Sequence, residues 1–102
     1  MTVKEMFEKK YKEYMANISK KAWENHNFYA NAKNIPVYEH IILCIEVTEK
    51  ELRENDIYYE VTDCDLVKLH KSKCLASNRH KSDFRNPSKF WLTKKGYKQL
   101  FA

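Results

Sequence analysis

The sequence predicts a small α+β domain that is mostly helical, and three observations lead to this fold class. The chain has 102 residues, of which 43% are hydrophobic, so it suits one domain with a filled core. It contains a single glycine, and because tight hairpins need glycine or asparagine at positive φ, a protein of many β-hairpins is disfavoured. Its apolar residues recur at helical spacing, and they follow residues that typically begin a helix.

The first element expected is an N-terminal helix. Thr2 and Glu5 have the spacing of a capping box, in which a hydroxyl and a carboxylate bond the free amides of a first turn. An apolar stripe then follows at steps of three and four: Val3, Phe7, Tyr11, Tyr14 and Ile18. This spacing predicts a helix over residues 3–18, with its continuation to Trp23 left open. An asparagine-rich turn over residues 25–34 is expected to end it.

The next segment permits two interpretations. Pro36 is tolerated in a first helical turn, and the apolar residues behind it suit a buried helix over residues 37–45. A strand over residues 40–47 is the alternative, because short apolar runs rich in β-branched residues fit both structures. The helix is favoured, since a buried strand needs neighbouring strands that the chain hardly offers.

The second half is expected to alternate short helices with extended segments. Thr48 and Glu51 form a second capping box, which predicts a helix that ends near Asn55. The remaining elements follow in this order: an extended segment or turn over residues 57–61, a helix that opens at residues 62–65, an extended segment over residues 74–80, a polar loop over residues 81–88, an extended segment over residues 89–93, and a last helix over residues 94–101 capped by Thr93.

Charge is divided unevenly along the chain. Residues 67–102 carry ten lysines and arginines against a single acid, Asp83, which gives a net charge of +9. Residues 35–66 carry nine acids against two bases, a net charge of −7, so the formal +5 of the whole chain averages two opposite segments. A concentrated positive surface attracts polyanions over a distance. Nucleic acid is therefore the partner that the charge pattern indicates.

Three segments give the C-terminal two-thirds a family resemblance. They are Thr48-Glu-Lys-Glu-Leu52, Asp65-Leu-Val-Lys-Leu69 followed by Cys74-Leu75, and Phe90-Trp-Leu-Thr-Lys-Lys-Gly96. Together with the basic loop over residues 79–89, they resemble the winged helix-turn-helix domains of bacterial, phage and plasmid DNA-binding regulators. The resemblance implies a winged-helix domain over residues 35–102 and an N-terminal helical extension over residues 1–34. Such extensions often form dimer contacts, which would here involve Phe7, Tyr11 and Tyr14.

The resemblance also implies where DNA is bound. The third helix would enter the major groove, the loop between the last two strands would form the wing, and the final helix would reach the backbone. These elements supply Lys68, Lys71, Ser72, Lys73, Arg79, His80, Lys81, Arg85, Lys89, Lys94 and Lys95. The expected function is sequence-specific binding of duplex DNA by a homodimer that serves as a transcriptional regulator or a replication or partition accessory factor. The connection over residues 56–62 is longer than the usual tight turn of the family.

Two other classes of partner remain open. Basic residues interleaved with Phe84 suit RNA or single-stranded DNA, whose bases stack on aromatic rings. The other alternative is a phage- or plasmid-type protein-binding module or inhibitor, which would contact a basic host protein through the acidic segment over residues 46–60.

Neither catalysis nor metal binding is expected. A single glycine excludes a glycine-rich phosphate loop, and acids on helices are usually solvated, so the chain is not expected to be an enzyme. Four residues have the ligand types of a zinc site, but their spacing matches no common pattern, so no metal or cofactor is expected; they are Cys64, His70, Cys74 and His80. An odd number of cysteines and the lack of a long apolar run indicate a cytoplasmic protein with no membrane partner.

Overall fold

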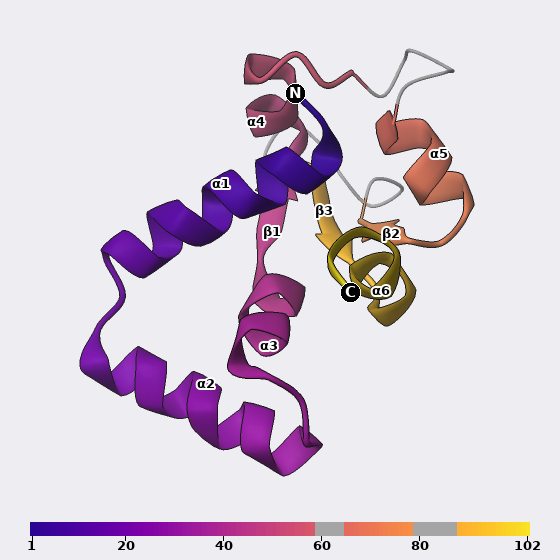
Figure 1. Ribbon diagram of the computed structural model, residues 1–102. Helices are drawn as coiled ribbons and strands as arrows, with labels where there is room; N and C mark the ends of the chain where they lie inside the picture. Colours follow the sequence, from indigo (N-terminus) through magenta and orange to yellow (C-terminus); the bar gives the residue numbers. More distant parts are fainter. Residues whose placement is uncertain (59–64, 79–87) are drawn as a thin grey trace.

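The computed structural model describes residues 1–58, 65–78 and 88–102, which form helices around a three-stranded antiparallel sheet (Figure 1). The α+β class with mostly helix is therefore confirmed. In chain order the elements are α1 Val3–Ala16, α2 Lys20–Lys33, α3 Val37–Cys44, β1 Glu46–Thr48, α4 Glu49–Glu54, α5 Asp65–Lys71, β2 Leu75–Ser77, β3 Lys89–Leu92 and α6 Lys94–Phe101. In this part of the chain, no helix has both the length and the apolar character that crossing a bilayer requires.

The N-terminal segment forms two helices where one was expected. The capping box is confirmed, because Thr2 Oγ1 accepts from the Glu5 amide at 3.1 Å and the Glu5 carboxylate accepts from the Thr2 amide at 3.0 Å. α1 ends at Ala16, two residues earlier than predicted. The hydroxyl of Ser19 then accepts from the Ala22 amide at 3.1 Å, and this cap begins α2.

The turn predicted over residues 25–34 was wrong, because this segment forms the greater part of α2. Asparagine disfavours helices when its side chain competes for backbone groups. Here the Asn27 amide donates to the Trp23 carbonyl one turn back, at 3.0 Å, so its polar group is satisfied within the helix. The chain turns only at Asn34, whose left-handed φ of 56° ends α2 in a conformation that asparagine tolerates.

The apolar segment that permitted two interpretations contains both structures in succession. α3 ends at Cys44 and β1 begins at Glu46, so the helix and the strand each take part of the run. Pro36 lies just before α3, where its missing N–H removes no helical hydrogen bond. The capping box that begins α4 is confirmed, since Thr48 Oγ1 accepts from the Glu51 amide at 3.1 Å.

The sheet has the order β1-β3-β2, with β3 antiparallel to both neighbours. Val47 lies opposite Phe90, and Leu75 lies opposite Leu92. All four side chains are fully buried, because alternate residues of each strand face the same side of the sheet and that side is the core. The extended segments predicted near β2 and β3 and the capped last helix are confirmed, whereas the loop between the strands falls largely outside the described residues.

α1 is part of the same core as the C-terminal elements. Val3, Met6 and Phe7 are buried in one cluster with residues of α3, the sheet and α6. Complete burial of a side chain as large as Phe7 is worth about 1.5–3 kcal/mol. An ion pair of 2.6 Å between Lys10 and Glu51 also ties α1 to α4. α1 therefore shares the core of residues 35–102, although it lies within the segment expected to be an extension.

α2 is attached differently. Ala30 is its one buried residue, and its packing partner is α3. Figure 1 shows α2 at the end of the molecule away from the sheet, joined to α1 by a short turn. The contacts between α2 and α3 include the rings of His26 and Tyr29 against His40, and His26 and His40 belong to the cluster described below.

Candidate functional site

The first candidate site is the junction at which α6 begins beside the end of α5. The Thr93 hydroxyl accepts from the Gly96 amide at 3.1 Å and so caps α6. The same hydroxyl donates to the Lys73 carbonyl at 2.7 Å, and the Thr93 amide donates to the Cys74 carbonyl at 3.1 Å. One threonine thus fixes the start of α6 against the turn that follows α5.

The chain's single glycine lies at this junction for a steric reason. A Cβ atom placed on Gly96 would lie 1.9 Å from the Cys74 carbonyl oxygen, far inside any permitted contact. Its φ is not positive, so close approach and not backbone freedom requires glycine here. The turn after α5 and the first turn of α6 can therefore be this close only because residue 96 has no side chain.

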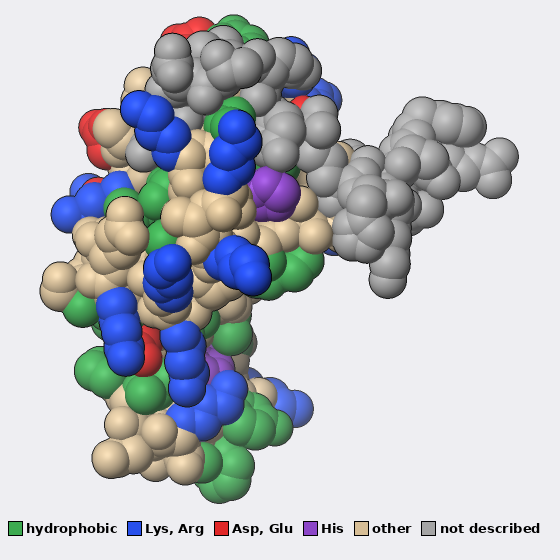
Figure 2. Space-filling model, turned by 90° about the vertical axis from the view of Figure 1, so that its right-hand side faces the viewer, with side chains coloured by type: hydrophobic (Ala, Val, Ile, Leu, Met, Phe, Trp, Pro, Cys, Tyr) green, Lys and Arg blue, Asp and Glu red, His purple; other side chains and the backbone are tan. Residues whose placement is uncertain are grey.

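The junction brings together basic residues from two elements. The ammonium of Lys95 donates to the Ser72 carbonyl at 2.8 Å, which links the start of α6 to the end of α5. Lys95 and five other exposed lysines of α5, of the turn after it and of α6 are named here the α5–α6 basic surface: Lys68, Lys71, Lys73, Lys94, Lys95 and Lys98. Figure 2 shows lysine and arginine side chains spread over the face that carries these elements, with few acidic side chains in view.

One of these lysines has an unfavourable backbone conformation. Lys73 has a φ of 64°, in the left-handed region that favours glycine and asparagine. A left-handed residue with a side chain costs about 1–2 kcal/mol relative to the ordinary conformation. The sequence nevertheless places an exposed lysine there.

The structure brings together part of the predicted DNA-binding set. Five of its lysines lie on the α5–α6 basic surface, and Ser72 is next to them with its hydroxyl donating to the Leu69 carbonyl at 3.1 Å. Lys89 is half-buried and lines a pocket beside α1 and α3. Arg79, His80, Lys81 and Arg85 lie outside the described residues. The sequence interpretation missed Lys98, although its spacing of four from Lys94 indicated a shared helix face.

The three residues predicted for a dimer contact differ in exposure. Phe7 is 1% exposed and belongs to the core of its own chain. Tyr11 is partly buried against that core, with its ring 4.7 Å from the ring of Tyr38. Tyr14 is exposed and shares a hydrogen bond of 2.7 Å with His26. Tyr14 is thus the member of the three that the surface offers to another molecule.

The zinc ligand types noted in the sequence have other partners in the described residues. The His70 ring shares a hydrogen bond of 3.1 Å with the Ser77 hydroxyl and lies edge-on to Phe90. Cys74 is buried, and its thiol donates to the side-chain oxygen Oε1 of Gln99 at 3.2 Å. Cys64 and His80 fall outside the described residues.

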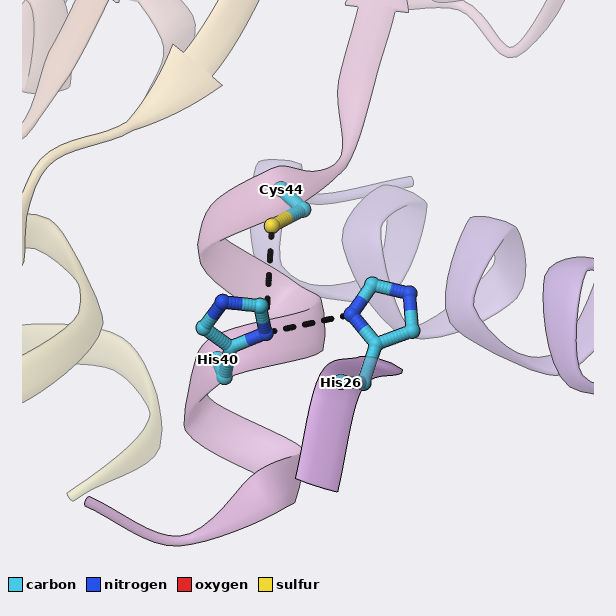
Figure 3. Close-up of side chains that lie close together, drawn as sticks. All are labelled: His26, His40 and Cys44. Carbon is cyan, nitrogen blue, oxygen red and sulfur yellow. Dashed lines mark hydrogen bonds between the residues drawn. The ribbon is translucent and has the colours of Figure 1, made fainter. Parts of the chain in front are cut away.

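A second group of metal-ligand types meets between α2 and α3. His26 comes from α2, whereas His40 and Cys44 come from α3, and Figure 3 shows the three side chains pointing toward one another. The distance between the two Nδ1 atoms is 3.1 Å, and His40 Nδ1 lies 4.0 Å from the Cys44 sulfur. The sequence interpretation missed this group, although His40 and Cys44 have the four-residue spacing of one helix face.

The surroundings shift the pKa values of His40 and Cys44 in opposite directions. Burial lowers the pKa of His40, and the neighbouring His26 and Lys33 lower it further, so its imidazole is neutral near pH 7. The Cys44 side chain is exposed as a whole, yet the part that packs against the protein loses water, and this raises the pKa of the thiol. Lys33 opposes that rise. Neutral imidazole nitrogen is the form that binds metal ions.

Comparison with known proteins finds no family model that matches the chain, no similar curated protein and no similar solved structure.

Proposed function

We propose that the chain binds duplex DNA through the α5–α6 basic surface, as a winged helix-turn-helix protein that regulates transcription or assists replication or partition. The observation that carries the proposal is that six exposed lysines belong to α5, the turn after it and α6, which are held together at a junction fixed by Thr93 and Gly96. Lysines at fixed positions neutralise phosphates and release counterions, which is the main source of affinity for DNA.

The fold supports this proposal in two ways. From α3 onward, the order of helices and strands suits a winged helix-turn-helix domain, with α5 as its third helix and β2 and β3 as the strands that flank a wing. α5 buries Leu66, Val67 and Leu69 and exposes Lys68 and Lys71. One face of the helix therefore holds it to the core, and the other is available to a groove of DNA.

The backbone conformation of Lys73 also supports the proposal. The left-handed conformation ends α5, since the Lys73 amide donates to the His70 carbonyl at 3.2 Å and the Cys74 amide donates to the Leu69 carbonyl at 2.9 Å, and glycine is the usual residue at such a helix end. Glycine would relieve the strain at this position and would remove the charge. A lysine held in the left-handed conformation beside Lys71 and Lys95 is therefore consistent with selection for charge at this place.

The proposal includes a homodimer that contacts two half-sites. α2 exposes the large aromatic side chains Trp23, Phe28 and Tyr29, with Phe28 67% exposed. Exposed apolar groups that gather on one element are typical of surfaces that contact another protein. A second copy bound there would give the assembly two basic surfaces, and the molar mass in solution, compared between the wild type and Phe28→Ser, tests this part.

The test is a titration of labelled duplex DNA of about 20 base pairs, two helical turns, followed by fluorescence anisotropy at several salt concentrations between about 50 and 200 mM. Three lysines of the basic surface are replaced together in the variant K71A/K73A/K94A. The matched control K12A/K20A/K21A removes the same charge from exposed positions of α1 and α2.

The proposal predicts that the first variant loses most of the affinity and that the control keeps it. If all three lysines contact phosphates, the slope of log K against log salt becomes shallower by about 2.7, at about 0.9 for each contact. Equal losses in the two variants would show a general charge effect and would sink the proposed surface. Single-stranded DNA and RNA of the same length are run in parallel, and tighter binding of either would replace duplex DNA as the partner.

A further inference from the structure

Between α2 and α3, side chains with metal-ligand atoms converge in a cluster that packing alone does not require. α2 buries a single alanine, so apolar burial gives it little attachment to the rest of the fold. Where the two helices meet, three side chains with metal-ligand atoms converge, and those atoms all lie within 4.8 Å of one another. We propose that His26, His40 and Cys44 bind a Zn²⁺ ion that fastens α2 to α3.

The distances between the ligand atoms suit tetrahedral zinc. Zinc–nitrogen bonds of about 2.0–2.1 Å and a zinc–sulfur bond of about 2.3 Å place neighbouring ligand atoms about 3.3–3.7 Å apart. The two Nδ1 atoms are 3.1 Å apart, and His40 Nδ1 is 4.0 Å from the Cys44 sulfur. Changes of side-chain torsion that move these atoms by about 1 Å complete the geometry without a change of backbone.

A neighbouring hydroxyl orients the His26 imidazole, and a neighbouring ring packs against the His40 imidazole. The hydroxyl of Tyr14, on α1, lies 2.7 Å from His26 Nε2. When Nε2–H donates to that oxygen, the lone pair of His26 is on Nδ1, where it accepts from Nδ1–H of His40, and zinc would take the place of that proton. The ring of Tyr29 stacks on His40 with centroids 6.1 Å apart and an angle of 12°. Tyr14 is thus a positioning residue for the site.

The ligand set selects the class of ion. Two imidazole nitrogens and one thiolate suit Zn²⁺, whereas Mg²⁺ and Ca²⁺ prefer oxygen ligands. Three protein ligands leave a fourth coordination position. His26 and Cys44 also line a pocket of about 600 Å³ that reaches α1 and β1, so the fourth position has room for water or a small anion. Lys10 and Glu13 are among the other residues of that pocket.

The experiment uses the full chain, with Zn²⁺ titrated calorimetrically and Co²⁺ as a spectroscopic probe. The wild type is expected to bind one Zn²⁺, to gain thermal stability with it because the ion binds the folded state, and to give a Co²⁺ spectrum with a thiolate charge-transfer band. Cys44→Ser removes that band, and His26→Gln weakens binding of Zn²⁺ at least tenfold. Tyr14→Phe keeps the band and weakens binding by about 10-fold or more, as loss of a group that orients a ligand does.

The control is the double variant C64S/H80Q, which alters two other residues of the same types. It is expected to bind Zn²⁺ as the wild type does, because neither residue belongs to the proposed set. Circular dichroism without zinc establishes that each variant is folded, and the exposed position of Cys44 favours a folded Cys44→Ser protein. The proposal is overturned if the wild type binds no Zn²⁺, if Mg²⁺ binds equally well, or if Cys44→Ser and His26→Gln both keep wild-type affinity.

Discussion

Replacement of Gly96 by alanine tests the packing of the α5–α6 junction. The added Cβ atom would lie 1.9 Å from the Cys74 carbonyl oxygen and 2.8 Å from its carbon. Contacts between carbon and a carbonyl oxygen begin at about 3.3 Å, so the two backbones must separate by about 1.4 Å. The obstacle is main chain that accepts a hydrogen bond from the Thr93 amide, so it cannot rotate away as a side chain would.

Whether Gly96→Ala lowers or raises the free energy of unfolding distinguishes this close packing from ordinary helix propensity. Without a clash, alanine in place of glycine would stabilise a helix by about 0.5–1 kcal/mol. Overpacking of this kind costs about 1–3 kcal/mol, so Gly96→Ala is expected to lower the free energy of unfolding. Urea denaturation followed by circular dichroism measures it, and the change should appear in the midpoint with an unchanged slope.

A pair of variants at Lys98 serves as the control, because this residue is exposed two positions further along α6. Lys98→Ala should exceed Lys98→Gly in stability by about 1 kcal/mol, which calibrates helix propensity in the same helix. Because Gly96→Ala moves the start of α6, it should also weaken DNA binding under conditions in which the protein is folded. If Gly96→Ala is as stable as the wild type or more stable, the described contact with Cys74 is incorrect.

Two further predictions concern charge and backbone strain. Lys73→Gly should raise the free energy of unfolding by up to about 1 kcal/mol and weaken DNA binding. The control Asp56→Gly, at a φ of 62°, should give a similar gain in stability without the loss of binding. Urea denaturation measures the stability and anisotropy measures the binding, and unchanged binding by Lys73→Gly would remove Lys73 from the interface. Burial raises the pKa of Glu51, but hydrogen bonds from Lys10 and Thr48 outweigh it, so the net pKa is lowered. The stability that follows is present above the pKa of an unfolded glutamate and is lost as pH falls through the lowered value. Lys10→Met should reduce this loss in acid denaturation curves, and an identical pH dependence would contradict the ion pair.

Local signals in the sequence were enough for the capped starts of α1, α4 and α6, but not for the start of α2 or for all the helix ends. The capping boxes at Thr2 and Thr48 and the cap at Thr93 depend on residues three apart, which a sequence displays directly. The prediction for the asparagine-rich segment was wrong because the sequence does not distinguish an asparagine whose side-chain amide bonds its own helix from an asparagine that ends a helix. The apolar run before Thr48 contains a helix followed by a strand, and the place where the helix ends and the strand begins depends on pairing with β3.

The sequence showed which types of residue the candidate sites would contain, but not which residues would meet in three dimensions. The basic character of residues 67–102 identified most of the α5–α6 basic surface, because charge can be counted along a chain. The contact between Gly96 and Cys74 joins residues far apart in sequence, so the reason for the single glycine appears only in three dimensions. The same holds for His26 and His40, which meet because the chain reverses at Asn34 between α2 and α3.

The central claim is that duplex DNA contacts the α5–α6 basic surface, and its most direct test is a map of amide chemical shifts as isotope-labelled protein is titrated with duplex DNA. The largest changes are predicted in α5, in the turn over residues 72–74 and in the first turn of α6, with little change on the acidic segment over residues 46–56. Changes confined to α2 or to the acidic segment, or no change at low salt, would contradict the claim.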